Sequence, residues 1–166
     1  MIFKIKKYFK SKKNKSFQDE LIDKLHREHE KLFEVVGKMD EAANNKDFKK
    51  LKKLIKTFKQ ELELHVLYED TNLYEHLYVR YHYYPKVKEE IQKKHNDIKD
   101  IAVVVVDFIA THKNLASIEE FQKDFNIIKD VLVKRVSFEE EILYEIYSTN
   151  QKASSIVEKL EKAKKN

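Results

Sequence analysis

Two stretches of the chain, seventy residues apart, repeat one pattern of ionisable and apolar side chains. The first, HVLYEDTNLYE, runs from His65 to Glu75, and the second, RVSFEEEILYE, runs from Arg135 to Glu145. A histidine four residues before a glutamate puts an imidazole and a carboxylate on one face of a helix, where both can ligate a metal ion. The second copy has the glutamate, Glu139, but an arginine in place of the histidine.

Two further histidines extend this repeat. His29, in REHEK, matches His95, in KKHND, sixty-six residues later. The first half of the chain therefore reads as a helical hairpin that is duplicated in the second half.

The absence of cysteine limits the chemistry that these residues can support. The chain has no Cys, which excludes a disulfide, an iron–sulfur cluster and a thiolate zinc site. A metal here must bind imidazole nitrogen and carboxylate oxygen.

The apolar stripes of the predicted helices place five such groups toward the core. The five are His29, His65, Glu69, His95 and Glu139, and Arg135 falls on the same inward face. A carboxylate buried without a partner would cost several kcal/mol, so these groups need a common counter-ion. A bound cation pair is the favoured interpretation, and a hydrogen-bonded polar core without metal is the alternative.

Helical periodicity places these side chains on four long helices. Ser16 begins the first, which runs to about Ala43, and Asp47 caps a second that continues to near Tyr84. The third spans about 86–112 with Pro85 near its first turn, and Ser117 with Glu120 opens the fourth as a capping box.

Short connections between long helices predict an all-α fold, an up-down-up-down four-helix bundle. We assign residues 1–15 to a basic N-terminal extension, 16–150 to the bundle and 151–166 to a helical tail, with Ser155 and Glu158 at the start of a short helix. One Gly and one Pro in 166 residues fit this class.

The charge distribution bears on partners. The net charge is +5, but residues 1–15 hold seven Lys and no acid, so the rest of the chain is close to neutral. We therefore expect no nucleic-acid binding, and at most weak contact of residues 1–15 with a membrane surface. The start lacks the continuous apolar stretch of a secretory signal, which predicts a cytoplasmic protein.

Over about residues 17–147 the pattern resembles the hemerythrin-like, or HHE cation-binding, family. The resemblance rests on Glu28 and His29, on His65, Glu69, Asp70, Leu73 and Tyr74, on His95, and on Glu139, Glu140, Leu143 and Tyr144. It implies a non-haem di-iron centre with His29, His65 and His95 as nitrogen ligands and Glu69 and Glu139 as carboxylates. Members of this family bind or sense dioxygen and other small redox ligands, or handle iron.

Arg135 departs from the family, which has a histidine there. A guanidinium carries a permanent charge and offers no lone pair to a metal. In one outcome the remaining ligands hold one or two irons, and Arg135 turns aside or pairs with Asp70 or Glu140. In the other, the guanidinium replaces the metal as partner of Glu69 and Glu139, which gives a metal-free pseudo-hemerythrin that acts through an unknown protein partner.

The leading functional hypothesis is binding or sensing of dioxygen or another small redox ligand at non-haem iron, without substrate turnover. The metal-free bundle is one alternative. An iron-oxidising or peroxidase-like enzyme is the other, because the site is rich in carboxylates.

Overall fold

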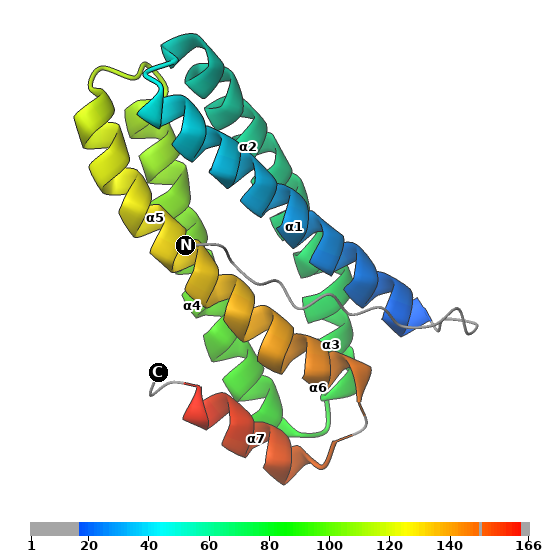
Figure 1. Ribbon diagram of the computed structural model, residues 1–166. Coiled ribbons are helices and arrows are strands. Elements are labelled where there is room, and N and C mark those ends of the chain that lie inside the picture. Colours follow the sequence, from blue (N-terminus) through cyan, green and yellow to red (C-terminus); the bar gives the residue numbers. More distant parts are fainter. Residues whose placement is uncertain (1–16, 150, 164–166) are drawn as a thin grey trace.

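The computed structural model describes residues 17–149 and 151–163, and these residues form a bundle of helices (Figure 1). The predicted basic extension 1–15 and the Ser16 start lie outside the described residues. In chain order the elements are α1 (Phe17–Asn44), α2 (Phe48–Glu69), η1 (Asp70–Tyr74), α3 (Glu75–Arg80), α4 (Pro85–His112), α5 (Ile118–Phe138), η2 (Glu139–Leu143), α6 (Tyr144–Ser148) and α7 (Ala153–Lys162).

Four long helical columns make the bundle. They are α1, then α2 continued through η1 and α3, then α4, then α5 continued through η2 and α6. Successive columns run in opposite directions (Figure 1). This confirms the all-α, up-down-up-down prediction. The short helix α7 crosses one end of the bundle against α4, with Ile156 and Leu160 buried. It begins at Ala153, two residues before the predicted start.

The predicted starts of the second, third and fourth long helices are confirmed. The Asp47 side chain accepts a hydrogen bond from the backbone N–H of Lys50 at 2.9 Å, and Ser117 accepts one from Glu120 at 3.2 Å. Pro85 stands in the first turn of α4. Each cap satisfies a backbone donor that a helix start leaves unpaired.

Two π-helical turns interrupt the columns, which the sequence pattern did not predict. One begins at Asp70, directly after Glu69, and the other begins at Glu139, so the π turns of the two motif copies are offset by only one residue. Each π turn widens the helix and changes the phase of the residues that follow. The second predicted helix is therefore not continuous, and its last part, α3, ends at Arg80 rather than near Tyr84.

The core consists of two apolar clusters with a polar layer between them. One cluster lies at the α1–α2 and α4–α5 connections and includes Met39, Leu51, Phe58, Phe121 and Phe125. The other lies at the α7 end and includes Leu25, Leu73, Ile91, Leu143 and Tyr147. The buried polar side chains between them are His29, His65, Glu69, His95, Arg135 and Glu139.

No helix in the described part of the chain has the length and apolar content that a membrane-spanning helix needs. The cytoplasmic location stays a prediction.

Candidate metal centre

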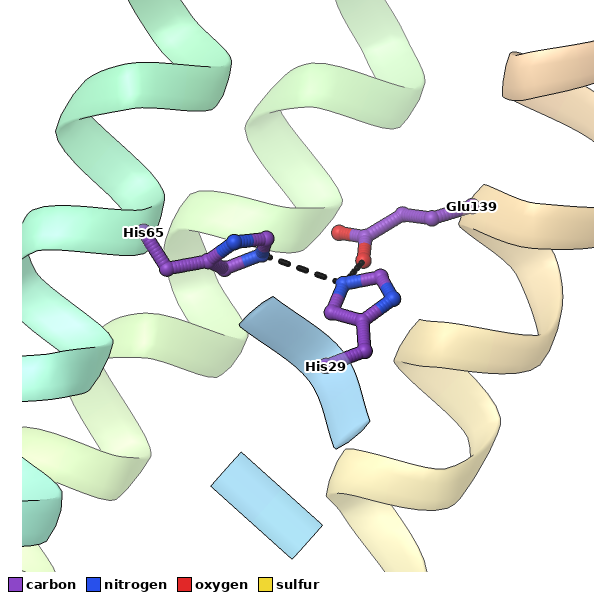
Figure 2. A group of neighbouring side chains, drawn as sticks. All are labelled: His29, His65 and Glu139. Atoms are coloured by element: carbon purple, nitrogen blue, oxygen red, sulfur yellow. Dashed lines mark hydrogen bonds and ion pairs between the residues drawn. The ribbon is translucent and has the colours of Figure 1, made fainter. Parts of the chain in front are cut away.

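The imidazoles of His29 and His65 face each other at the centre of the polar layer. Figure 2 shows the His29 side chain extending from α1 and the His65 side chain from α2. Their Nε2 atoms lie 3.1 Å apart. Both side chains are 2% exposed. Two buried imidazoles can approach this closely when a proton or a metal ion lies between their lone pairs.

Glu139 completes a group of three around the same point. Its Oε2 atom lies 3.2 Å from His29 Nε2, and one ligand atom each from His29, His65 and Glu139 lies within 4.8 Å of the others (Figure 2). Oε2 is buried and has no hydrogen-bond partner in suitable geometry. A buried carboxylate oxygen without a hydrogen bond is rare in native structures and calls for an explanation.

Arg135 holds the other side of this carboxylate. Its Nε donates to Glu139 Oε1 at 2.6 Å, and its Nη2 donates to Glu69 Oε2 at 3.0 Å. All three side chains are almost fully buried. One guanidinium therefore bridges two carboxylates, through the fork geometry that suits arginine to this role.

The motif carboxylates that follow Glu69 and Glu139 do not pair with Arg135. Asp70 accepts a hydrogen bond from His95 Nε2 at 2.7 Å, and Glu140 accepts one from His29 Nδ1 at 2.8 Å. In both copies the π turn thus directs the second carboxylate to a histidine.

His95 lies outside the group of three. While its Nε2 donates to Asp70, its Nδ1 accepts a hydrogen bond from the Tyr78 hydroxyl at 2.7 Å. The ring stacks on Tyr74, with centroids 3.8 Å apart. Burial lowers the pKa of His95 and outweighs the hydrogen bond to Asp70, which would raise it. The ring is therefore neutral. Both ring nitrogens are therefore occupied by protein groups.

Carboxylates also fix the orientation of the two facing imidazoles. Glu28 accepts a hydrogen bond from His65 Nδ1 at 3.1 Å, as Glu140 does from His29 Nδ1. Glu140 is held in turn by the partly exposed His26, 3.0 Å away. Because a carboxylate accepts only, each Nδ1 carries a proton and each Nε2 is directed to the centre.

The protonation states follow from these contacts. Burial alone would lower the pKa of His29, but the carboxylates of Glu139 and Glu140 outweigh it and raise the pKa to about 9. Burial lowers the pKa of His65 and outweighs its hydrogen bond to Glu28. At neutral pH without metal, His29 is therefore an imidazolium whose Nε2–H donates to the free Nε2 of His65.

The two buried glutamates share one guanidinium and titrate as a pair. Burial and the charge of Glu139 raise the pKa of Glu69, against the effect of Arg135. Burial would also raise the pKa of Glu139, but the charge of Arg135 and the contact with His29 hold it well below its usual range. Glu139 is consequently the ionised member of the pair.

The three convergent atoms fit one metal ion. Ligands about 2.1 Å from an ion and at right angles to each other are about 3 Å apart. The separations of His29 Nε2 from His65 Nε2 and from Glu139 Oε2, 3.1 and 3.2 Å, match that value. A proton can satisfy only one of these two contacts, whereas a metal ion can bind all three atoms.

Of the five ligands expected from the resemblance, the structure brings three together. Glu69 lies farther out, with its Oε2 3.9 Å from His65 Nε2 and paired with Arg135. His95 is turned to Asp70 and Tyr78. Tyr144 is a further site residue, with its hydroxyl 3.4 Å from His29 Nε2, and its place in the repeated LYE segment was the available signal for it.

A four-helix bundle with buried imidazoles and carboxylates at mid-height defines a class of cation-binding bundle proteins. The family model described as hemerythrin HHE cation binding domain matches residues 20–147, which span most of the chain. The chain therefore belongs to the hemerythrin HHE cation-binding family. Neither the curated proteins nor the solved structures gave a match to it.

Proposed function

We propose that this protein binds non-haem iron through His29, His65 and Glu139, and that it binds or senses dioxygen or another small redox ligand there. The observation that carries the proposal is the convergence of two buried Nε2 atoms and a buried carboxylate oxygen without a hydrogen-bond partner. Family membership supports cation binding in general.

The donor set favours ferrous iron among common metals. Two imidazoles and one carboxylate with open positions are typical of non-haem Fe(II) sites. Iron bound by three protein groups keeps positions free for a small ligand, which is what ligand binding or sensing requires. The chain has no thiolate to offer, so the competing cysteine-rich zinc sites are excluded.

Neighbouring side chains prepare this site in advance. Glu28 and Glu140 hold the Nδ1 atoms of His65 and His29, so that both Nε2 atoms are aimed before any metal arrives. His29 must lose its proton on binding, so the metal replaces the proton shared with His65.

Tyr144 is placed to contact a small ligand. Its hydroxyl lies 3.4 Å from His29 Nε2 and 3.5 Å from Glu69 Oε1. Burial and the nearby carboxylates raise the pKa of Tyr144 well above its ordinary value, so the phenol keeps its proton. It can donate a hydrogen bond to an oxygen-containing ligand beside His29.

A metal-free pseudo-hemerythrin is the second candidate, and the position of Arg135 favours it. The guanidinium lies between Glu69 and Glu139, where it compensates buried carboxylate charge without a metal ion. Such a bundle would act through a protein partner. The metal-free bundle gives Glu139 Oε2 no partner, whereas the iron-binding proposal gives this buried oxygen a metal ion to bind.

The deciding experiment is metal analysis of the full chain purified under anaerobic conditions with ferrous iron. Bound iron that resists gel filtration, and that is lost in a His65→Ala variant which remains helical, supports the proposal. Absence of bound iron in the folded wild-type protein would overturn it in favour of the metal-free bundle. Oxygen uptake beyond one stoichiometric event would instead indicate the iron-oxidising or peroxidase-like enzyme.

A further inference from the structure

We infer that the centre is a one-metal site in which the side chain of Arg135 permanently takes the place of the second metal ion. This inference rests on the proposed iron binding and adds the number of ions. In a two-metal site, each half of the repeat would have to supply the terminal ligands of one ion. The two halves differ in whether their residues can do so.

The first half is complete. His29 and His65 direct their Nε2 atoms to a common point, and Glu28 holds the Nδ1 atom of His65 at 3.1 Å. In the second half the corresponding residues are His95, Arg135 and Lys94. None of these three can play the part of its first-half counterpart. Arg135 has no lone pair for a metal, Lys94 has no carboxylate, and both ring nitrogens of His95 are already hydrogen-bonded.

Arg135 stands where His65 stands in the first half and provides charge instead of a lone pair. It donates to Glu69 and to Glu139, the carboxylates of the two motif copies, at 3.0 and 2.6 Å. A second metal ion would need these same oxygens. It would also stand beside a buried cation that cannot lose its proton.

His95 corresponds to His29, yet it binds its carboxylate through the other ring nitrogen. His29 uses Nδ1 for its carboxylate and keeps Nε2 at the centre, whereas His95 uses Nε2 for Asp70 and Nδ1 for Tyr78. Its stacking on Tyr74 holds the ring in this position. Ligation by His95 would require breaking both hydrogen bonds.

Lys94 corresponds to Glu28, so the carboxylate that would orient a histidine at position 135 is replaced by an ammonium group. Lys94 is buried, with its Nζ 5.1 Å from the centre of the Phe138 ring and 3.7 Å from Asp97. The ligand and its supporting carboxylate are thus both exchanged for cations in the same half-site. These two exchanges together exclude a divalent ion more effectively than either one alone.

The test is the number of ferrous ions bound per chain under anaerobic conditions. We expect one in the wild-type protein and two in the double variant Lys94→Glu/Arg135→His, which restores the first-half residues in the second half. The matched control is Lys93→Glu/Lys134→His, which makes similar exchanges at the adjacent exposed positions and should still bind one.

Each count has a distinct meaning. Two ions in the wild type would overturn this inference and leave the proposed iron binding intact, whereas none would overturn both. One ion in a folded Lys94→Glu/Arg135→His variant would show that these side chains do not exclude the second metal. If that variant does not fold, paramagnetic resonance of the oxidised wild type decides, because an isolated high-spin ferric ion gives a signal that a coupled pair lacks.

Discussion

His29 and His95 occupy equivalent positions of the internal repeat but present different ring nitrogens to their carboxylates. His29 Nδ1 lies 2.8 Å from Glu140, and His95 Nε2 lies 2.7 Å from Asp70. The first arrangement leaves Nε2 aimed at His65 and Glu139. The second, together with the Tyr78 hydroxyl, uses up the imidazole. One duplicated pattern has therefore produced one half-site arranged for a metal and one closed by protein groups.

The carboxylates behind the ligands should control metal affinity. Replacing Glu28 or Glu140 by Gln removes the charge that fixes the Nδ1–H of His65 or His29, and we expect each variant to bind ferrous iron about 10–100-fold more weakly. Competition with a chelator of known affinity measures this. Asp124→Asn is the matched control, because Asp124 also holds a histidine, His112, at 2.9 Å but away from the site. Equal weakening in that control would contradict a positioning role.

Much of the fold could be predicted from the sequence because the apolar stripes and the helix starts are local signals. Asp47, Pro85 and Ser117 each mark a helix start through a property of their own backbone or side chain. The two π turns could not be predicted, because one extra residue in a helical turn leaves no compositional mark. Each π turn rotates the side chains that follow it about the helix axis, relative to their places in a continuous α-helix.

The site was predictable in its residue types and less so in its pairing. The inward faces of His29, His65 and Glu139 follow from helical spacing alone. The partner of Arg135 does not, because four acidic side chains lay within reach of its position in the predicted bundle. The choice of Glu69 and Glu139 over Asp70 and Glu140 depends on the π turns, which direct Asp70 and Glu140 to histidines.

The turn between α1 and α2 offers a test of the fold away from the site. Lys46 has a φ of 54°, in the left-handed region that glycine adopts without steric cost. Lys46→Gly should therefore raise the free energy of unfolding by about 1 kcal/mol. Urea denaturation measures the change. Lys52→Gly, at an exposed position inside α2, should lower stability by about 1 kcal/mol, and a similar loss at position 46 would contradict the turn geometry.

Arg135 should be essential to the stability of the metal-free protein. Arg135→Met leaves Glu69 and Glu139 buried beside each other without their shared cation, and we expect a loss of about 3–5 kcal/mol in the free energy of unfolding. Adding Glu69→Leu should recover part of that loss, because it removes one of the two unpaired carboxyl groups. Denaturant titrations in the presence of a chelator give both values.

A nearby exposed lysine provides the control for this pair of variants. Lys134→Met makes a comparable change of charge and shape on the outer surface and should alter stability by less than about 0.5 kcal/mol. If Arg135→Met were as stable as Lys134→Met, the guanidinium bridge would not support the core.

The stability of the metal-free protein should fall as the pH rises above neutrality. The pKa of His29 is raised from 6.5 to about 9, so its contribution is complete below pH 6.5 and is lost as the pH rises through 9. This difference corresponds to about 3 kcal/mol. The pKa of Glu69 is also raised, so the loss of its proton likewise lowers the free energy of unfolding as the pH rises. Urea denaturation between pH 6 and 9, with chelator present, measures the decline.

Iron should offset this dependence, because it binds the deprotonated form of His29. The stabilisation that ferrous iron adds should therefore grow as the pH rises toward 9, by up to about 1.4 kcal/mol per pH unit while His29 is the group that loses a proton. His29→Gln removes that proton and should flatten the decline seen without metal. A decline of unchanged size in a folded His29→Gln variant would show that the shared proton between His29 and His65 is not its source.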